Sequence, residues 1–299
     1  MKIYSKKEHF FMMDIAYYNG VITPYDAACI PLSDRSVFFA DAVYDVMIGR
    51  GKFPYQAEEH LSRLLENGRA VGFENLPSPE ELAEAITDAL SVADAEDFTL
   101  YIQLSGRQKR RLHSRTESGV NLLITVTELT LPTELSTIRA MTLPDLRHGY
   151  CNIKTTNLFP AVLSVALAES AGSEIAIFHK NEWVSECSYA NVSIVSGGVL
   201  LTHPHDTSVL PGISEQNLIR AAEGVGLGHE IRTFTVAEML SADLVLITST
   251  TKLLKLCTEI NGRQLPCRGI GLARALFEVM KNDFMIKTDK KSKEYLHNM

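Results

Sequence analysis

The sequence predicts a protein of the α+β class, and three observations carry this expectation. The first 128 residues alternate strand and helix signals, whereas several short strands separated by turns crowd residues 174–202. Helical segments are interspersed among these strands, without the regular alternation of a doubly wound sheet. With 299 residues and 45% hydrophobic composition, the chain can bury one large core or two modest ones.

Bulk composition excludes several classes of protein. A formal charge of −7 argues against a nucleic-acid partner, which would select a basic face. We expect no membrane partner, because no run of about 18 apolar residues occurs, and the first 20 residues lack the apolar core of a secretory signal. Five scattered cysteines without a CxxC pair predict neither a metal site nor a disulfide framework, which favours a cytoplasmic protein with reduced thiols.

The first 128 residues are expected to form a small domain. Residues 37–48 are rich in β-branched and aromatic side chains and favour a strand, and residues 57–72 carry leucines at helical spacing. Ser78 and Glu81 predict a capping box that opens the next helix. Two strands are predicted at 97–105 and 120–128, joined by the basic stretch 106–115.

A polar, proline-containing connector at 129–137 separates residues 1–128 from a larger domain at 138–299. In the larger domain we expect helices, short strands and a frayed basic tail. One helix is predicted to begin at Pro160, a second to follow residues 211–214, and a third to cover 268–282. Later strands are predicted near 229–234 and at 243–251, and a short helix precedes the second of these strands. The tail carries four lysines within 287–293.

The chain resembles the class IV (fold-type IV) aminotransferases, which depend on pyridoxal 5'-phosphate (PLP). Blocks in the order of the family carry this resemblance from about residue 18 to about residue 262. The blocks are FFADAVYDV (38–46), EEHLSRL (58–64), CNIKTTN (151–157), VSECSYANV (184–192), VLPGIS (209–214) and ITSTT (247–251). The resemblance implies a two-domain α+β fold, with a small N-terminal α/β domain and a larger C-terminal β-barrel-like domain with helices.

Four residues near the reacting atoms follow from this resemblance. Lys154 would hold PLP covalently and carry the substrate proton, and Glu186 would pair with the pyridine nitrogen. Leu210 would pack near the ring, and Tyr44 would lie in the substrate pocket. Without the resemblance, the residues around Lys154 form no recognisable motif. The alternative interpretations are a solvated strand residue for Glu186 and core residues for Leu210 and Tyr44.

Five residues are implied to hold the cofactor phosphate. Arg63 would bind it from a helix, and Ile213 and Ser214 would offer backbone N–H groups at a helix N-terminus, where anions are favoured. Ser249 and Thr250 would add hydroxyl or amide contacts. The alternative interpretations are that Arg63 is a surface arginine, that Ser214 simply caps the helix, and that Ser249 and Thr250 lie at an exposed strand end.

The basic stretch 106–115 decides the subtype. Arg111 and His113 match an Arg-x-His pair that receives the substrate carboxylate in D-amino acid transaminases, and residues two apart on an extended segment face the same way. The plain alternative is a solvated basic loop. Departures from the family occur at Asp45, at Ser105–Gly106–Arg107 and at Tyr189, and they bear on the identity of the substrate.

The expected activity is a ping-pong transfer of the amino group of a D-amino acid, such as D-alanine, to a 2-oxo acid, such as 2-oxoglutarate. The resemblance also implies a homodimer. Three alternatives stay open: an aminotransferase for branched-chain L-amino acids, an aminodeoxychorismate lyase, and a non-catalytic interaction protein of the same fold. Intact Lys154 and Glu186 argue against the last.

Overall fold

The computed structural model describes residues 14–108 and 110–289, and these form two compact units. Among the described residues, the first unit runs from Asp14 to Leu131 and includes Lys154–Asn157 and Met285–Asp289. The second unit holds Pro132–Ile153 and Leu158–Phe284. Three of the four lysines of the expected frayed tail lie outside the described residues. None of the described helices is long and apolar enough to cross a membrane.

The first unit is built on an antiparallel sheet with the strand order β2-β1-β6-β5-β3-β4. Its strands are β1 (Ile15–Tyr18), β2 (Val21–Pro24), β3 (Ala42–Arg50), β4 (Phe53–Pro54), β5 (Asp97–Gly106) and β6 (Val120–Glu128). The predicted strands 97–105 and 120–128 are therefore confirmed as β5 and β6. They pair over their full length, from Phe98 opposite Glu128 to Gly106 opposite Val120.

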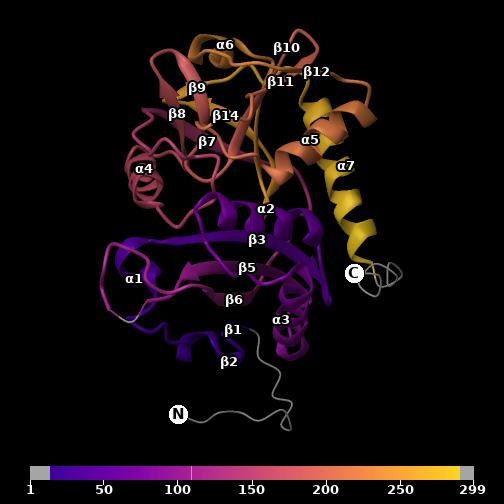
Figure 1. Ribbon diagram of the computed structural model, residues 1–299. Helices are drawn as coiled ribbons and strands as arrows, with labels where there is room; N and C mark the ends of the chain where they lie inside the picture. Colours follow the sequence, from indigo (N-terminus) through magenta and orange to yellow (C-terminus); the bar gives the residue numbers. More distant parts are fainter. Residues whose placement is uncertain (1–13, 109, 290–299) are drawn as a thin grey trace. The chain divides into compact units, whose positions relative to one another are not determined.

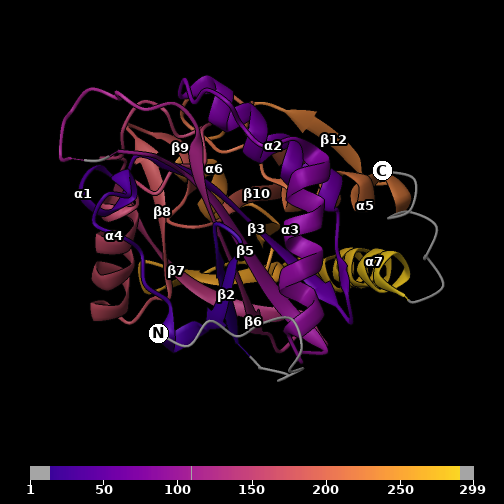
Figure 2. The same ribbon diagram turned by 60° about the horizontal axis from the view of Figure 1, so that its bottom comes forward.

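Two amphipathic helices, α2 (Ala57–Ala70) and α3 (Pro79–Val92), cover one face of this sheet. They lie side by side in Figure 2, with α2 on β3 and α3 on β1 and β6. Their buried positions, which include Leu61, Leu64 and Leu82, follow the helical period. The predicted capping box is present, because Ser78 and Glu81 exchange side-chain and backbone hydrogen bonds.

One local prediction in this unit is wrong. Residues 37–39, expected in a strand, belong to the short helix α1 (Arg35–Phe39), and β3 begins only at Ala42. The carboxylate of Asp34 accepts a hydrogen bond from the Ser36 N–H and so caps this helix. The cap outweighs the β-preference of the three side chains that follow it. A 3₁₀ turn (Tyr25–Ala27) precedes it.

The second unit contains a larger mixed sheet with the order β12-β11-β10-β13-β14-β7-β8-β9, and β15 is added to β14. Its strands are β7 (Ser136–Pro144), β8 (Ile175–Lys180), β9 (Trp183–Cys187), β10 (Asn191–Ser196), β11 (Val199–Thr202), β12 (Gly228–Ile231), β13 (Leu244–Ser249), β14 (Leu253–Ile260) and β15 (Arg263–Gln264). β7 runs parallel to β8 and β14, and β11 runs parallel to β12.

This sheet curls into the expected barrel-like form, which Figure 1 shows for β7–β14. β9 and β10 lie close together although they stand far apart in the strand order, and a tight turn at residues 188–190 joins them. Its apolar core includes Ile177, Val192 and Ile247, each at most 3% exposed.

The helices of the second unit are α4 (Phe159–Ser170), α5 (Ile213–Gly224), α6 (Val236–Ser241) and most of α7 (Ile270–Thr288). α4 packs on β7 and β8, where Ala168 meets Ala176 and Phe178. α5 packs on β12, β13 and β14. The helices expected after Pro160 and after residues 211–214 are thus confirmed.

Candidate functional site

The segment that contains Lys154 is held to β3 by backbone hydrogen bonds. The Tyr44 N–H donates to the Lys154 carbonyl at 2.9 Å, and the Thr156 N–H donates to the Ala42 carbonyl at 3.1 Å. Thr155 forms a β-bridge with Val43 between these two bonds. The segment is therefore paired with the first unit by an isolated β-bridge, and this pairing brings Lys154 and Tyr44 together.

The side chain of Lys154 lies over the ring of Tyr44, with Nζ at 4.6 Å from the ring centroid. Among the described residues, the amine makes no hydrogen bond or ion pair, and it is half-buried. Tyr44 stacks on Tyr101 at 5.2 Å, and the Tyr101 hydroxyl donates to Gln103 at 2.6 Å. Burial, with a smaller contribution from Tyr44, raises the pKa of Tyr101, so this hydroxyl stays protonated.

Arg63 on α2 is oriented by a buried carboxylate on the strand that carries Tyr44. Its Nε and Nη2 donate to the two oxygens of Asp45, each at 2.8 Å, and His60 Nδ1 lies 2.8 Å from Asp45 Oδ1. Asp45 is fully buried. Burial would raise the pKa of Asp45, but the charge of Arg63 and the hydrogen bond from His60 outweigh it and hold this pKa well below its usual range.

Glu186 on β9 is fixed in the second unit by partners on both carboxylate oxygens. Oε1 accepts a hydrogen bond from Arg147, and Oε2 accepts from the Leu210 N–H at 3.1 Å and from Asn191 Nδ2 at 3.4 Å. Glu186 is only 6% exposed. A buried carboxylate with an arginine partner remains an anion, which is the charge state that a protonated pyridine nitrogen requires.

Arg147 is a residue that the sequence analysis missed. Beyond Glu186, its guanidinium donates to Asp145 at 2.7 and 2.9 Å and to the Ser208 carbonyl at 3.0 Å, and it lies 4.7 Å from the Phe178 ring centroid. Burial would lower the pKa of Arg147, but the hydrogen bond to Asp145 and the charge of Glu186 raise it above its usual value. The arrangement Asp145-Leu-Arg147, seven residues before Lys154, is the sequence signal that could have pointed to it.

The start of α5 forms a narrow backbone cradle beside Asn191. Gly212 is the residue before the helix, and a Cβ atom there would lie 2.0 Å from Asn191 Oδ1. Asn191 Nδ2 also donates to the Leu210 carbonyl at 2.8 Å. Ile213 and Ser214 occupy the first two helical positions, and no side chain caps this helix. Ser214 thus does not act as the cap, which corrects the simple capping alternative.

Ser249 and Thr250 lie at the end of β13, next to the start of β10. In the sheet, Thr248 stands opposite Asn191, and β13 is one of the strands on which α5 packs. Ser249 and Thr250 are half-buried. The second unit therefore brings Glu186, Leu210, the first turn of α5 and the end of β13 into one neighbourhood through Asn191.

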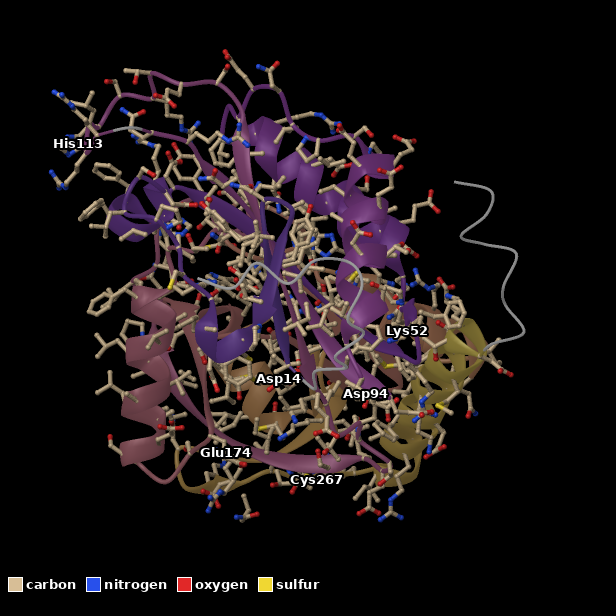
Figure 3. The ribbon with its side chains drawn as sticks, turned by 90° about the horizontal axis from the view of Figure 1, so that it is seen from below. Asp14, Lys52, Asp94, His113, Glu174 and Cys267 are labelled. Atoms are coloured by element: carbon tan, nitrogen blue, oxygen red, sulfur yellow. The ribbon has the colours of Figure 1, made fainter. Side chains whose placement is uncertain are left out.

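Arg111 and His113 are exposed on the segment between β5 and β6. His113 lies at the outer edge of the side chains in Figure 3. Both approach the ring of Phe39 on α1: Arg111 Cζ lies 5.1 Å and the His113 ring 5.3 Å from its centroid. The two side chains therefore share Phe39 as a neighbour. Within the described part of the chain, no contact joins either of them to Tyr44 or Lys154.

A cavity of about 430 Å³ opens in the first unit between these regions. His113 and Phe39 line one part of it, and Thr155 and Asn157, which follow Lys154, line another. A pocket of this size holds a small polar molecule. Among the described residues, no group of His, Cys, Asp or Glu is placed to hold a metal ion.

Comparison with known proteins agrees with this geometry. The family model for aminotransferase class IV matches residues 42–260. A D-alanine aminotransferase of Bacillus licheniformis is 28% identical over 91% of this chain and 98% of that protein, and one of Listeria innocua is 33% identical over 83% and 88%.

Solved structures show the same fold. A branched-chain aminotransferase from Thermoproteus uzoniensis, crystallised with norvaline, superimposes with a TM-score of 0.81 at 19% identity and covers 93% of this chain and 96% of its own. The family match spans more than half of the sequence and contains the Lys154 and Glu186 neighbourhoods. The chain therefore belongs to the class IV aminotransferases, enzymes that use PLP to move amino groups.

Proposed function

We propose that this enzyme transfers the amino group of a D-amino acid, such as D-alanine, to a 2-oxo acid, such as 2-oxoglutarate. One observation carries the choice of substrate: Arg111 has no carboxylate partner among the described residues, and it converges with His113 on Phe39. A guanidinium held on aromatic rings and beside an imidazole is suited to a carboxylate. The similarity to D-alanine aminotransferases supports the same choice.

The residues present fit PLP. The buried Glu186 anion would hold the pyridine nitrogen, and Leu210 would pack near the ring, because its N–H already bonds to Glu186. When bound, PLP supplies an electron sink that stabilises negative charge at the substrate Cα. Arg147 keeps Glu186 charged and oriented, and it is a supporting residue that we add to the site.

The phosphate would be held by charged and backbone donors. Arg63, aimed by Asp45, would supply the positive charge. Ile213 and Ser214 would supply N–H groups at the uncapped start of α5, where only glycine at position 212 lets the backbone pack against Asn191. Ser249 and Thr250 would complete the set from the end of β13.

Lys154 would hold the cofactor and then move the proton at the substrate Cα. Its amine is not committed to any hydrogen bond or ion pair among the described residues, so it is free to accept and return a proton. Tyr44, whose ring lies under that amine, would bound the substrate side of the site. Arg111 and His113 would receive the α-carboxylate and thereby orient the Cα–H bond.

A substrate panel tests this proposal. With 2-oxoglutarate as acceptor, D-alanine should give pyruvate, whereas activity on L-leucine alone would show a branched-chain aminotransferase. Release of an aromatic product and pyruvate from aminodeoxychorismate would show the lyase. A protein that stays colourless with PLP, and takes no label on borohydride reduction, would be a non-catalytic member of the fold.

Arg111→Ala isolates the substrate-binding role. The KM for D-alanine should rise about 10- to 100-fold, the value of one hydrogen bond to a charged group, while PLP absorbance is unchanged. Arg110→Ala is the matched control, because it removes the same charge from the neighbouring exposed position. Equal KM values for the two variants would refute the role of Arg111.

We also propose a cytoplasmic homodimer. α4 exposes an apolar face that includes Phe159 (76% exposed), Val162 (62%) and Leu163 (48%), and burial of such a face against a second copy is favourable. Five free thiols, two of them buried, suit a reducing compartment. Sedimentation as a monomer at micromolar concentration would exclude the dimer, and cell fractionation would test the compartment.

A further inference from the structure

The segment between β5 and β6 is held by a cluster of charged side chains at α1, in addition to its own short-range contacts. We propose that Arg35 is the positioning residue that presents Arg111 and His113 to the substrate carboxylate. This inference rests on the proposed function, and it concerns how the binding pair is oriented. α1 and the segment run side by side in both Figure 1 and Figure 2.

The guanidinium of Arg35 binds the backbone of the segment directly. It donates to the Leu112 carbonyl at 2.6 Å, to the His113 carbonyl at 2.9 Å and, less closely, to the Ser114 carbonyl at 3.4 Å. Arg35 is only 5% exposed, so water does not compete for these bonds. Because the donors of a guanidinium form a rigid fork, three consecutive carbonyls around one arginine fix the local direction of the chain.

Asp41 anchors Arg35 and also the far side of the segment. Arg35 Nε donates to Asp41 Oδ2 at 2.6 Å, and Arg115 binds both oxygens of the same carboxylate. Arg115 in turn donates to the Val71 carbonyl at 2.6 Å. Burial would raise the pKa of Asp41, but the hydrogen bonds from Arg115 and Arg35 outweigh it and lower this pKa, so the carboxylate stays charged.

Gly106 provides an independent sign that this cluster is built into the fold. A Cβ atom at Gly106 would lie 2.9 Å from Arg35 Cδ and 3.2 Å from Asp41 Oδ2, so only glycine lets the pair pack against the end of β5. Asp34, next to Arg35, accepts hydrogen bonds from Ser105 at 2.7 Å and Asn121 at 2.9 Å. Asp34, the residue before Arg35, is therefore hydrogen-bonded to both strands that flank the segment, β5 and β6.

The ring of Phe39 lies between Arg35 and the proposed binding pair, Arg111 and His113. Its ring centroid lies 4.7 Å from Arg35 Cζ and 5.1 Å from Arg111 Cζ, and the His113 ring also approaches it. Arg35 thus reaches the pair by two routes, through the backbone of residues 112–114 and through Phe39. Loss of Arg35 should therefore leave the side chain of Arg111 intact but remove the hydrogen bonds that fix the backbone beside it.

Arg35→Gln tests the proposal in the PLP-loaded enzyme. The KM for D-alanine should rise about tenfold, with kcat and PLP absorbance nearly unchanged. In the double variant with Arg111→Ala, the KM should equal that of Arg111→Ala alone, because Arg35 acts only through the pair. The matched control is Arg50→Gln, which removes the ion pair with Asp97 at the opposite end of β3 and β5 and should lower Tm without changing KM.

Trypsin cleavage supplies a readout that is independent of activity. Cleavage after Arg110 and Arg111, followed by mass spectrometry, should be several-fold faster in Arg35→Gln than in the parent or in Arg50→Gln. Should Arg35→Gln fail to fold, Arg35→Lys retains the charge but cannot bridge three carbonyls, and it should show the same KM and cleavage changes.

The outcomes separate this inference from the function on which it rests. If Arg111→Ala raises the KM but neither Arg35 variant does, the positioning role is wrong and the proposed function stands. If the Arg35 and Arg111 effects multiply in the double variant, Arg35 acts by another route and the inference is overturned. If Arg111→Ala leaves the KM unchanged, the proposed function and this inference fail together.

Discussion

The two ionisable groups expected at the cofactor ring, Lys154 and Glu186, are held in opposite ways. Glu186 has hydrogen-bond partners on both oxygens, and one of them is a buried arginine with a second carboxylate behind it. Lys154 is fixed only through its backbone, and its amine rests on the ring of Tyr44. The structure thus immobilises one charge and leaves the other free to move.

This difference fits the work proposed for each residue. A carboxylate that maintains the charge of a ring nitrogen should not move or take up a proton during the reaction, so several partners are useful. An amine that binds and releases a cofactor and carries a proton must change partners, so a permanent ion pair would hinder it. Mutations can separate the two arrangements, because the partners of Glu186 should contribute strongly to the free energy of unfolding, whereas the Lys154 amine should not.

The largest effect should come from Lys154→Ala. Turnover should fall by at least about 10³-fold, because both the covalent link to PLP and the proton carrier are lost. Thermal stability without cofactor should stay close to that of the parent, since the amine makes no hydrogen bond or ion pair among the described residues. Stopped-flow absorbance and calorimetry measure the two quantities. A large fall in Tm would show that the amine has structural partners after all.

Arg147→Met should reduce both stability and turnover. Removal of one partner of a buried ion pair leaves Glu186 and Asp145 without their cation and should lower the free energy of unfolding by about 3–5 kcal/mol. Arg139→Met is the control, because its ion pair with Glu174 is 3.9 Å long and about half-exposed. Equal urea midpoints for the two variants would contradict the supporting role of Arg147.

Asp45→Asn should give the smallest effect, and one that depends on pH. The pKa of Asp45 is lower in the folded than in the unfolded state, so its contribution to stability is full above about pH 4 and is lost as the pH falls further. The variant should be about 3 kcal/mol less stable at pH 7, and the gap should narrow towards pH 3. Urea titrations at both values test this, with exposed Asp88→Asn as control. A gap that is constant with pH would exclude the ion pair as its origin.

The fold could be predicted from sequence where local chemistry and tertiary packing agree. The helix α3 was predicted together with its capping box, because Ser78 and Glu81 act within one turn. Residues 37–39 were wrongly expected in a strand, because their β-preference yields to a cap on Asp34 that is itself held by distant Ser105 and Asn121. β14 (Leu253–Ile260) was not predicted, although it completes the centre of the larger sheet.

The candidate site shows the same limit. Lys154, Glu186 and Arg63 stand out only as members of ordered blocks, and their roles remain proposals. Arg147 and Asp45 were given no role, because their partners Glu186 and Arg63 lie far away in sequence, and for Arg147 only the nearby Asp145 offers a local signal. Arg35 could not be found at all from sequence, since its partners are backbone carbonyls, which every residue possesses.

The pairing of residues 154–156 with β3 has a consequence for folding. Its hydrogen bonds are among the long-range contacts of the first unit: Thr156 Oγ1 bonds to the Ala40 carbonyl, 116 positions away. Contacts of such sequence separation form slowly, because a long loop must close first. During synthesis, the N-terminal sheet can assemble before this segment pairs with it. If Lys154 holds PLP as proposed, capture of the cofactor would mark the chains in which this late pairing has formed.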